Sequence, residues 1–64
     1  MIRVGCLLYG YCDGYFDNSY YNKRVESVGQ DWVVAREIDT GRVVFYYGNI
    51  DLLLPFIGKD GQKE

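Results

Sequence analysis

The 64-residue chain contains no histidine, and this absence bears first on catalysis. Histidine is the side chain that most often acts as a general acid or base near neutral pH. The chain also lacks a glycine-rich phosphate loop, and no serine, cysteine or lysine nucleophile has an evident base beside it. Asp13 and Asp17 could formally act as a carboxylate pair, but loop acids near glycine are commonly solvated turn formers. We therefore expect a non-enzymatic protein without a cofactor.

Cysteine is scarce, with Cys6 and Cys12 as the two thiols. If the segment between them is extended, their Cα atoms lie roughly 20 Å apart, beyond disulfide reach unless the chain turns tightly at Gly10. Two cysteines without a histidine also fall short of a zinc site. We expect two free thiols and no metal, with Cys6 as a small core residue on the same strand face as Val4 and Leu8.

Acidic residues outnumber basic ones, so the formal net charge is −2. An acidic domain lacks the basic field that supplies most of the affinity for phosphate backbones, so nucleic acid is the less favoured partner. No stretch is long or apolar enough to span a bilayer, and the first residues lack the charged region and apolar run of a signal peptide. These features predict no membrane partner and a cytoplasmic location.

Aromatic residues, in contrast, are abundant: the chain has seven tyrosines, three phenylalanines and one tryptophan. Large rings bury much area each, so a few of them can stabilise a small core, and they also suit contact surfaces. A chain of this length forms one domain. We place that domain at residues 1–58 and expect the polar residues 59–64 to form a flexible tail.

The pattern of short runs is typical of an all-β protein. Eight glycines divide the chain into segments in which apolar and polar residues tend to alternate, as strands require. The predicted strands cover residues 2–9, 23–28, 31–38, 42–47 and 52–57. The connections are a long aromatic-rich first loop at 10–22, a hairpin turn at 39–41 and a short helical turn at 48–51. Five short strands with this spacing fit a small barrel, whose closure also removes open edges.

Two stretches of the chain resemble the Src-homology-3 (SH3) family. Leu7-Leu8-Tyr9-Gly10-Tyr11 is similar to the family's opening Ala-Leu-Tyr-Asp-Tyr motif. Residues 31–50 are similar to its Asp-Trp-Trp strand, Thr-Gly hairpin, return strand and Pro-Ser-Asn-Tyr turn. Together the stretches span somewhat under half the chain, and they imply a five-strand SH3-like barrel. The chain also faintly resembles short uncharacterised proteins encoded by bacterial viruses, which implies no function.

Four positions depart from the family's pattern. Gly10 replaces an aspartate, and Val33 replaces the second tryptophan. Tyr47 stands where the ligand-contacting proline would be, and Ile50 stands where a contacting tyrosine would be. The resemblance therefore implies the barrel more strongly than it implies a groove for a Pro-rich ligand.

The resemblance also implies a partner-binding surface. In the family, residues at the positions of Tyr9 and Tyr11 line slots for an extended ligand in the polyproline II conformation, and the ring at Trp32 lies at the centre of the groove. Acids of the first loop would meet a basic residue of the ligand. The candidate partner-binding residues are therefore Tyr9, Tyr11, Asp13, Asp17, Trp32, Tyr47 and Asn49.

Several of these rings have a core interpretation as well. Tyr9 and Tyr11 could equally cap the open end of the barrel, and Trp32 could be an ordinary core tryptophan. Phe16, whose side chain has no polar atom, is expected in the core.

Neighbouring residues of a strand point to opposite faces, which separates the tyrosine pairs. One of Tyr20 and Tyr21 should be buried and the other exposed. Of Tyr46 and Tyr47, we expect Tyr46 inside and Tyr47 outside.

The basic residues could suggest single-stranded nucleic acid stacked on the aromatic rings. The surrounding acids nearly cancel their charge, so a solvated strand face with pairs across strands is the favoured interpretation. The residues concerned are Lys23, Arg24, Arg36 and Arg42 with Glu26 and Glu37.

These features together predict a binding module that recognises a protein or peptide partner through an aromatic face. The partner could be a second copy, since an aromatic patch or a barrel edge can be buried in a homodimer. The alternatives are a small-barrel nucleic-acid-binding protein and a structural subunit of a homo-oligomer. An accessory role in a phage or a bacterium, acting on a host component, fits a chain of this size.

Overall fold

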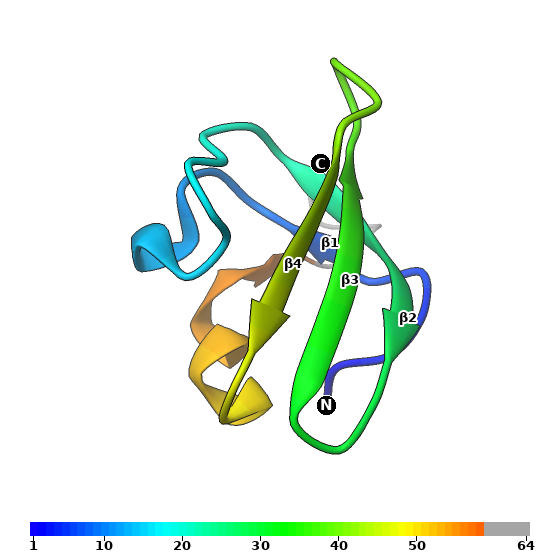
Figure 1. Ribbon diagram of the computed structural model, residues 1–64, viewed down its shortest axis with the longest axis vertical. Coiled ribbons are helices and arrows are strands. Elements are labelled where there is room, and N and C mark those ends of the chain that lie inside the picture. The colour runs from blue at the N-terminus through cyan, green and yellow to red at the C-terminus, as the bar shows by residue number, and fades with distance from the viewer. Residues whose placement is uncertain (59–64) are drawn as a thin grey trace.

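The computed structural model describes residues 1–58, and the tail expected at residues 59–64 lies outside this range. Five strands and two 3-10 helices make up the fold (Figure 1). The strands are β1 (Leu7–Leu8), β2 (Lys23–Val28), β3 (Trp32–Glu37), β4 (Val43–Tyr47) and β5 (Ile57–Gly58). The 3-10 helices are η1 (Cys12–Gly14) in the long first loop and η2 (Ile50–Phe56) before the last strand.

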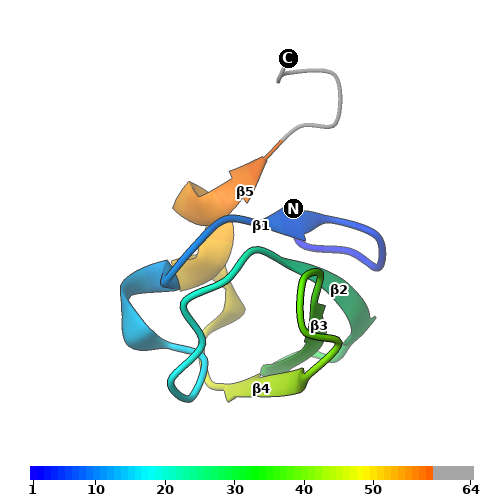
Figure 2. The same ribbon diagram turned by 90° about the horizontal axis from the view of Figure 1, so that it is seen from above.

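All strand pairs are antiparallel, and the order in the sheet is β4-β3-β2-β1-β5. The prediction of a mostly β protein with five strands is confirmed. The sheet curves around the core, as Figure 2 shows, but within residues 1–58 no ladder joins β4 to β5. Closure of the sheet into a barrel, which was expected to remove the edges, is therefore not observed, and β4 and β5 are the edge strands. In the same range no helix is long and apolar enough to cross a membrane.

The three central strands follow their alternating sequences. Val25 of β2 pairs with Ala35 of β3, and Ala35 pairs with Val44 of β4; all three side chains are buried. The hairpin between β3 and β4 turns at Gly41, whose φ of +77° favours glycine, and the Thr40 hydroxyl accepts a hydrogen bond from the Arg42 N–H. The predicted positions of these strands and of this turn are confirmed.

The first strand is much shorter than predicted. Gly5 has a φ of +96°, and the Cys6 N–H bonds the carbonyl of Arg3, so the chain turns before the ladder begins at Leu7. The turn breaks the expected alternation, and Val4 is 63% exposed. Cys6 is only half-buried and packs against the edge of the core, so its assignment as a core residue was too strong.

The last strand is also shorter than predicted, because the residues expected to form it are helical. The Asn49 side chain accepts a hydrogen bond from the Asp51 N–H and caps η2, which continues to Phe56. Of the predicted residues 52–57, only Ile57 lies in β5, which pairs with β1 through Ile57 and Gly58. The helical turn was correctly predicted before the last strand, but its length was underestimated.

The core combines strand residues with residues of the loop and η2. Phe16 and Leu53 are fully buried, which confirms the prediction for Phe16. Cys12 is also buried, and both cysteines are free thiols as expected. The remaining buried apolar residues are Ile2, Leu8, Val25, Val33, Ala35, Val44 and Tyr46.

The charged residues of β2 and β3 do not form a uniformly solvated face. Arg36 and Glu26 pair across the strands at the surface, with Nε 2.7 Å from the carboxylate, as expected. Lys23 and Glu37 are buried, contrary to that prediction. Both lie on the inward side of their strands, where Val25 and Ala35 also point.

Candidate partner-binding surface

The outward side of β3 and β4 carries a row of apolar residues. Trp32 lies directly opposite Tyr47, and Val34 lies opposite Phe45. Val43 continues the row on β4 and lies opposite Arg36. Cross-strand partners project to the same side of a sheet, so these residues form one surface. We call Trp32, Val34, Val43, Phe45 and Tyr47 the strand face.

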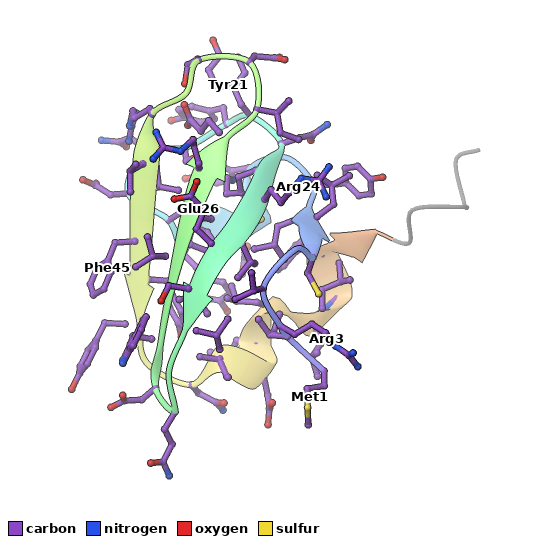
Figure 3. All side chains as sticks on the ribbon, turned by 90° about the vertical axis from the view of Figure 1, so that its right-hand side faces the viewer. Met1, Arg3, Tyr21, Arg24, Glu26 and Phe45 are labelled. Atoms are coloured by element: carbon purple, nitrogen blue, oxygen red, sulfur yellow. The ribbon has the colours of Figure 1, made fainter. Side chains whose placement is uncertain are left out.

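The β4 half of the strand face is well exposed. Tyr47 is 67% exposed, Phe45 is 52% exposed and Val43 is 49% exposed. The rings of Phe45 and Tyr47 stack with their centroids 6.4 Å apart and an interplanar angle of 18°. Figure 3 shows Phe45 projecting away from the sheet into solvent. Scattered exposed apolar residues are ordinary, but neighbours on one strand form a patch.

Trp32 forms the inner border of the strand face and is only partly exposed. Its indole covers Gly29, because a Cβ built at Gly29 would overlap the Nε1 side of the ring. The Gly29 N–H also donates to the Trp32 carbonyl at 2.9 Å. Trp32 is thus neither a core residue nor a freely projecting ring. It is held in one position, as an anchor residue in an interface needs to be.

Tyr47 and Asn49 follow each other at the end of β4, with Tyr47 outside and Tyr46 inside as predicted. The Tyr46 hydroxyl donates to the carbonyl of Asn49 at 3.1 Å. The Asn49 side-chain oxygen accepts from the Asp51 N–H at 3.0 Å, so this oxygen is engaged in the cap. The side-chain amide of Asn49 is exposed and can still donate to a partner.

Tyr9 and Tyr11 lie on the other part of the predicted surface, at the start of the long loop. The Tyr9 ring covers Gly58, where a Cβ would overlap it, and the ring keeps 38% exposure. The Tyr11 ring stacks on Tyr20 with centroids 4.9 Å apart and planes 7° apart. Tyr20 and Tyr21 are both exposed, so the prediction that one of them is buried was wrong. They lie before β2, where strand alternation does not apply.

Asp13 and Asp17 are exposed residues of the same loop. Asp13 lies in η1 with a φ of +54°, and the carbonyl of Asp17 accepts a hydrogen bond from the Arg42 guanidinium. Neither carboxylate makes a hydrogen bond or an ion pair with another part of residues 1–58. Both are free to meet a basic group.

The seven predicted residues therefore fall into two groups. Trp32, Tyr47 and Asn49 lie at one end of β3 and β4, whereas the other four belong to the loop side of the molecule (Figure 1). No ring stacking or hydrogen bond in the described part of the chain joins the two groups. Between the two groups lies the core, where the Tyr15 ring is 5.4 Å from the Tyr46 ring.

Three residues of the strand face were missed from the sequence: Val34, Val43 and Phe45. The signal that could have found them is alternation, because Val43 and Phe45 share the outward orientation of Tyr47 along β4 and Val34 shares that of Trp32 along β3. What alternation does not show is that no other element within residues 1–58 covers the exposed β4 half of this surface.

A buried polar cluster lies between the long loop and the sheet. The Lys23 ammonium donates to the carbonyl of Gly10 at 2.7 Å and lies 5.1 Å from the centre of the Phe16 ring. Glu37 accepts hydrogen bonds from the hydroxyls of Ser19, at 2.6 Å, and Thr40. These internal bonds fix the loop to β2 and β3.

The environment changes the acidity of three groups in this cluster. Burial lowers the pKa of Lys23, and burial raises the pKa of the Cys12 thiol, which lies 3.8 Å from the Lys23 nitrogen. The hydrogen bonds from Ser19 and Thr40 lower the pKa of Glu37. Because these side chains are buried and bonded within the chain, the cluster stabilises the fold and does not offer a site that a substrate could reach.

Among the described residues, no group of three or more His, Cys, Asp or Glu side chains could hold a metal ion. Comparison of the chain with protein-family models, curated proteins and solved structures found no match.

Proposed function

We propose that the chain is a non-enzymatic binding module that recognises a protein or peptide partner through the strand face. The observation that supports this most strongly is the exposure of Val43, Phe45 and Tyr47 side by side on an uncharged strand. Burying a large apolar side chain stabilises a complex by about 1.5–3 kcal/mol when the burial is complete. Two stacked rings next to a fixed Trp32 can therefore supply much of a binding energy with little loss of conformational entropy.

The loop group provides a second contact region in this proposal. The Tyr11–Tyr20 stack offers a flat apolar surface, and Asp13 and Asp17 are exposed acids of the same loop. A partner with a basic residue next to its apolar anchor would suit both regions.

We also propose that the fold is an SH3-like barrel. It is supported by the order of the elements: a long first loop, a Thr-Gly hairpin and a 3-10 helix before a short last strand that pairs with the first. The departures at Tyr47 and Ile50 argue against assuming a Pro-rich ligand.

Affinity capture from an extract of the native cell tests the function. Tyr47→Ala and Trp32→Ala should each reduce the captured partner at least about tenfold, the loss of about 1.4 kcal/mol that removal of an anchor produces. Tyr21→Ala is the matched control, because it deletes an exposed ring that lies outside the strand face. Equal capture by all variants would show that the strand face does not bind.

The salt dependence of binding distinguishes the alternative function, nucleic-acid binding, from protein binding. A labelled oligonucleotide that binds tightly at low salt and is released as salt rises would replace the protein-partner proposal. The formal charge of −2 leads us to expect no such binding.

A further inference from the structure

The strand β4 has a free backbone edge as well as an exposed face. At the two ends of the β3–β4 ladder the Glu37 N–H donates to the Arg42 carbonyl, and the Gly48 N–H donates to the Asp31 carbonyl. Residues that bond a given neighbour alternate along an antiparallel strand. Val44 and Tyr46 therefore bond β3, whereas the three other residues of β4 direct their N–H and C=O groups away from it. These three are Val43, Phe45 and Tyr47.

No other group takes up these backbone atoms among the described residues. The long loop reaches β4 from the core side, where Tyr15 and Phe16 pack on the inward-pointing Tyr46 ring. At the first end of β4 the loop is bonded by the Arg42 side chain and not by the edge groups of Val43. Three N–H and three C=O groups thus remain free on an exposed edge.

Natural edge strands usually carry features that prevent pairing with another chain. Common ones are a lysine, a proline, a bulge or a very short length. The sequence of β4 is Val-Val-Phe-Tyr-Tyr, without charge or proline, and its register with β3 is continuous over all five residues. The register shift in this sheet lies instead between Val25 and Ser27 of β2. The edge of β4 is therefore unprotected.

We propose that β4 of a second copy pairs antiparallel with this edge, on a two-fold axis at Phe45. In this register Phe45 faces Phe45 of the second copy, and Val43 faces Tyr47. The free groups of each strand then meet those of the other, forming about six hydrogen bonds. The outward side chains form an aromatic pair and two pairs of an aromatic with a β-branched residue, which are favourable across strands.

The absence of charged residues on β4 indicates that the strand pairing with its edge is β4 of a second copy. An uncharged edge is best matched by an uncharged strand, because an unpaired charge on the added strand would lie against apolar side chains. Among the longer strands, β2 carries Lys23, Arg24 and Glu26, and β3 carries Arg36 and Glu37. The strand that meets the requirement is β4 itself. In the two-fold arrangement no like charges lie opposite each other.

The pairing goes beyond the proposed function and does not depend on it. It uses the backbone edge of β4, so the strand faces of the two copies remain open and become continuous. A five-residue edge covers less than the roughly 800 Å² per partner of a standard interface, so the dissociation constant should be on the order of 10–100 µM. At such concentrations the chain would present one double-sized aromatic surface.

Sedimentation over about 10 µM to 1 mM tests the pairing with two charge variants. The two-fold axis places residue 45 opposite itself, so Phe45→Lys and Phe45→Glu should each weaken self-association at least about tenfold by like-charge repulsion. Their equimolar mixture should associate again, as a heterodimer. Both changes lie at an exposed position, and circular dichroism verifies that the variants fold. A monomeric wild type at 1 mM, or a mixture that stays monomeric, would overturn the proposal.

Val43→Pro provides an independent variant. Proline is tolerated as the first residue of an edge strand, and here it removes an N–H that faces away from β3. It should abolish self-association. Trp32→Ala should reduce partner capture while leaving self-association intact, because Trp32 lies on β3 and not on the β4 edge, and this separates failure of the pairing from failure of the proposed function. If Val43→Pro self-associated as strongly as the wild type, this result would contradict pairing at this edge.

Discussion

Lys23 and Glu37 lie directly opposite each other in β2 and β3, both buried, yet they do not form an ion pair with each other. Lys23 is bonded by the long loop, and Glu37 is bonded by the long loop and by Thr40 of the β3–β4 turn. Ser19 serves both, since its carbonyl accepts from the Lys23 ammonium at 3.5 Å and its hydroxyl donates to Glu37. An unpaired buried charge would be strongly destabilising, so these bonds couple the conformation of the loop to the sheet.

The first prediction concerns acid stability. The pKa of Glu37 in the folded state is lower than its ordinary value of 4.5. The stabilisation is therefore complete above pH 4.5 and is lost as the pH falls towards the folded-state pKa. Urea unfolding measured between pH 3 and pH 7 should show this loss in the wild type, and Glu37→Gln should flatten the curve in the acid range.

Glu26→Gln is the matched control for this prediction, because Glu26 pairs with Arg36 at the exposed surface of the neighbouring strand. Surface pairs contribute little, so this variant should keep the acid dependence of the wild type. If Glu37→Gln retained the same dependence as Glu26→Gln, the buried cluster would not be what acid disrupts.

The second prediction concerns the two thiols. Cys12 is 2% exposed, and burial raises the pKa of its thiol, so little thiolate is available. Cys6 is half-buried and can be reached by a reagent. A thiol reagent added to the native protein should therefore modify one cysteine quickly and the other only as the protein unfolds. Cys6→Ser should remove the fast phase; two equal rates in the native state would be incompatible with a buried Cys12.

The third prediction compares two neighbours in η2. Leu53 is fully buried, whereas Leu52 is 44% exposed. Leu53→Ala should lower the free energy of unfolding by about 2–5 kcal/mol, because it removes buried contacts and leaves a cavity. Leu52→Ala should change it by less than about 0.5 kcal/mol. Chemical denaturation of both variants measures the difference, and equal values would mean that η2 does not dock through Leu53.

The fourth prediction tests how Trp32 is held. The backbone of Gly29 is outside the positive-φ region, so alanine is tolerated there, but its Cβ would displace the indole. Gly29→Ala should change the emission of the single tryptophan and reduce partner capture. It should cost about 1–3 kcal/mol of stability through overpacking. Gln30→Ala, in the same turn, is the control and should preserve the emission spectrum. An unchanged spectrum for Gly29→Ala would show that the indole does not rest on Gly29.

The sequence predicted the long strands well and the short ones poorly. β2, β3 and β4 have five or six residues between glycine-containing turns, so alternation has enough positions to be visible. β1 and β5 have two residues each and exist only because they pair with each other and with β2. No local pattern distinguishes such pairs from the surrounding chain.

The candidate site was predicted where strand alternation applies. The outward position of Tyr47 follows from alternation, and the same reasoning would have found Phe45. The Tyr11–Tyr20 stack joins residues nine positions apart in an irregular loop, where no periodicity helps. Alternation also places Lys23 and Glu37 inward with Val25 and Ala35. Their charge nevertheless favoured exposure to solvent, because the sequence does not predict where the hydroxyl of Ser19 lies.

The strand face as the binding surface is tested most directly by ¹⁹F NMR of fluorotryptophan at Trp32, the single tryptophan of the chain. The partner captured from the native cell is purified and titrated into the labelled protein. We predict that the resonance shifts or broadens as the partner is added and that Tyr47→Ala suppresses this change. A partner that binds while the resonance stays unchanged would place the contact elsewhere on the molecule.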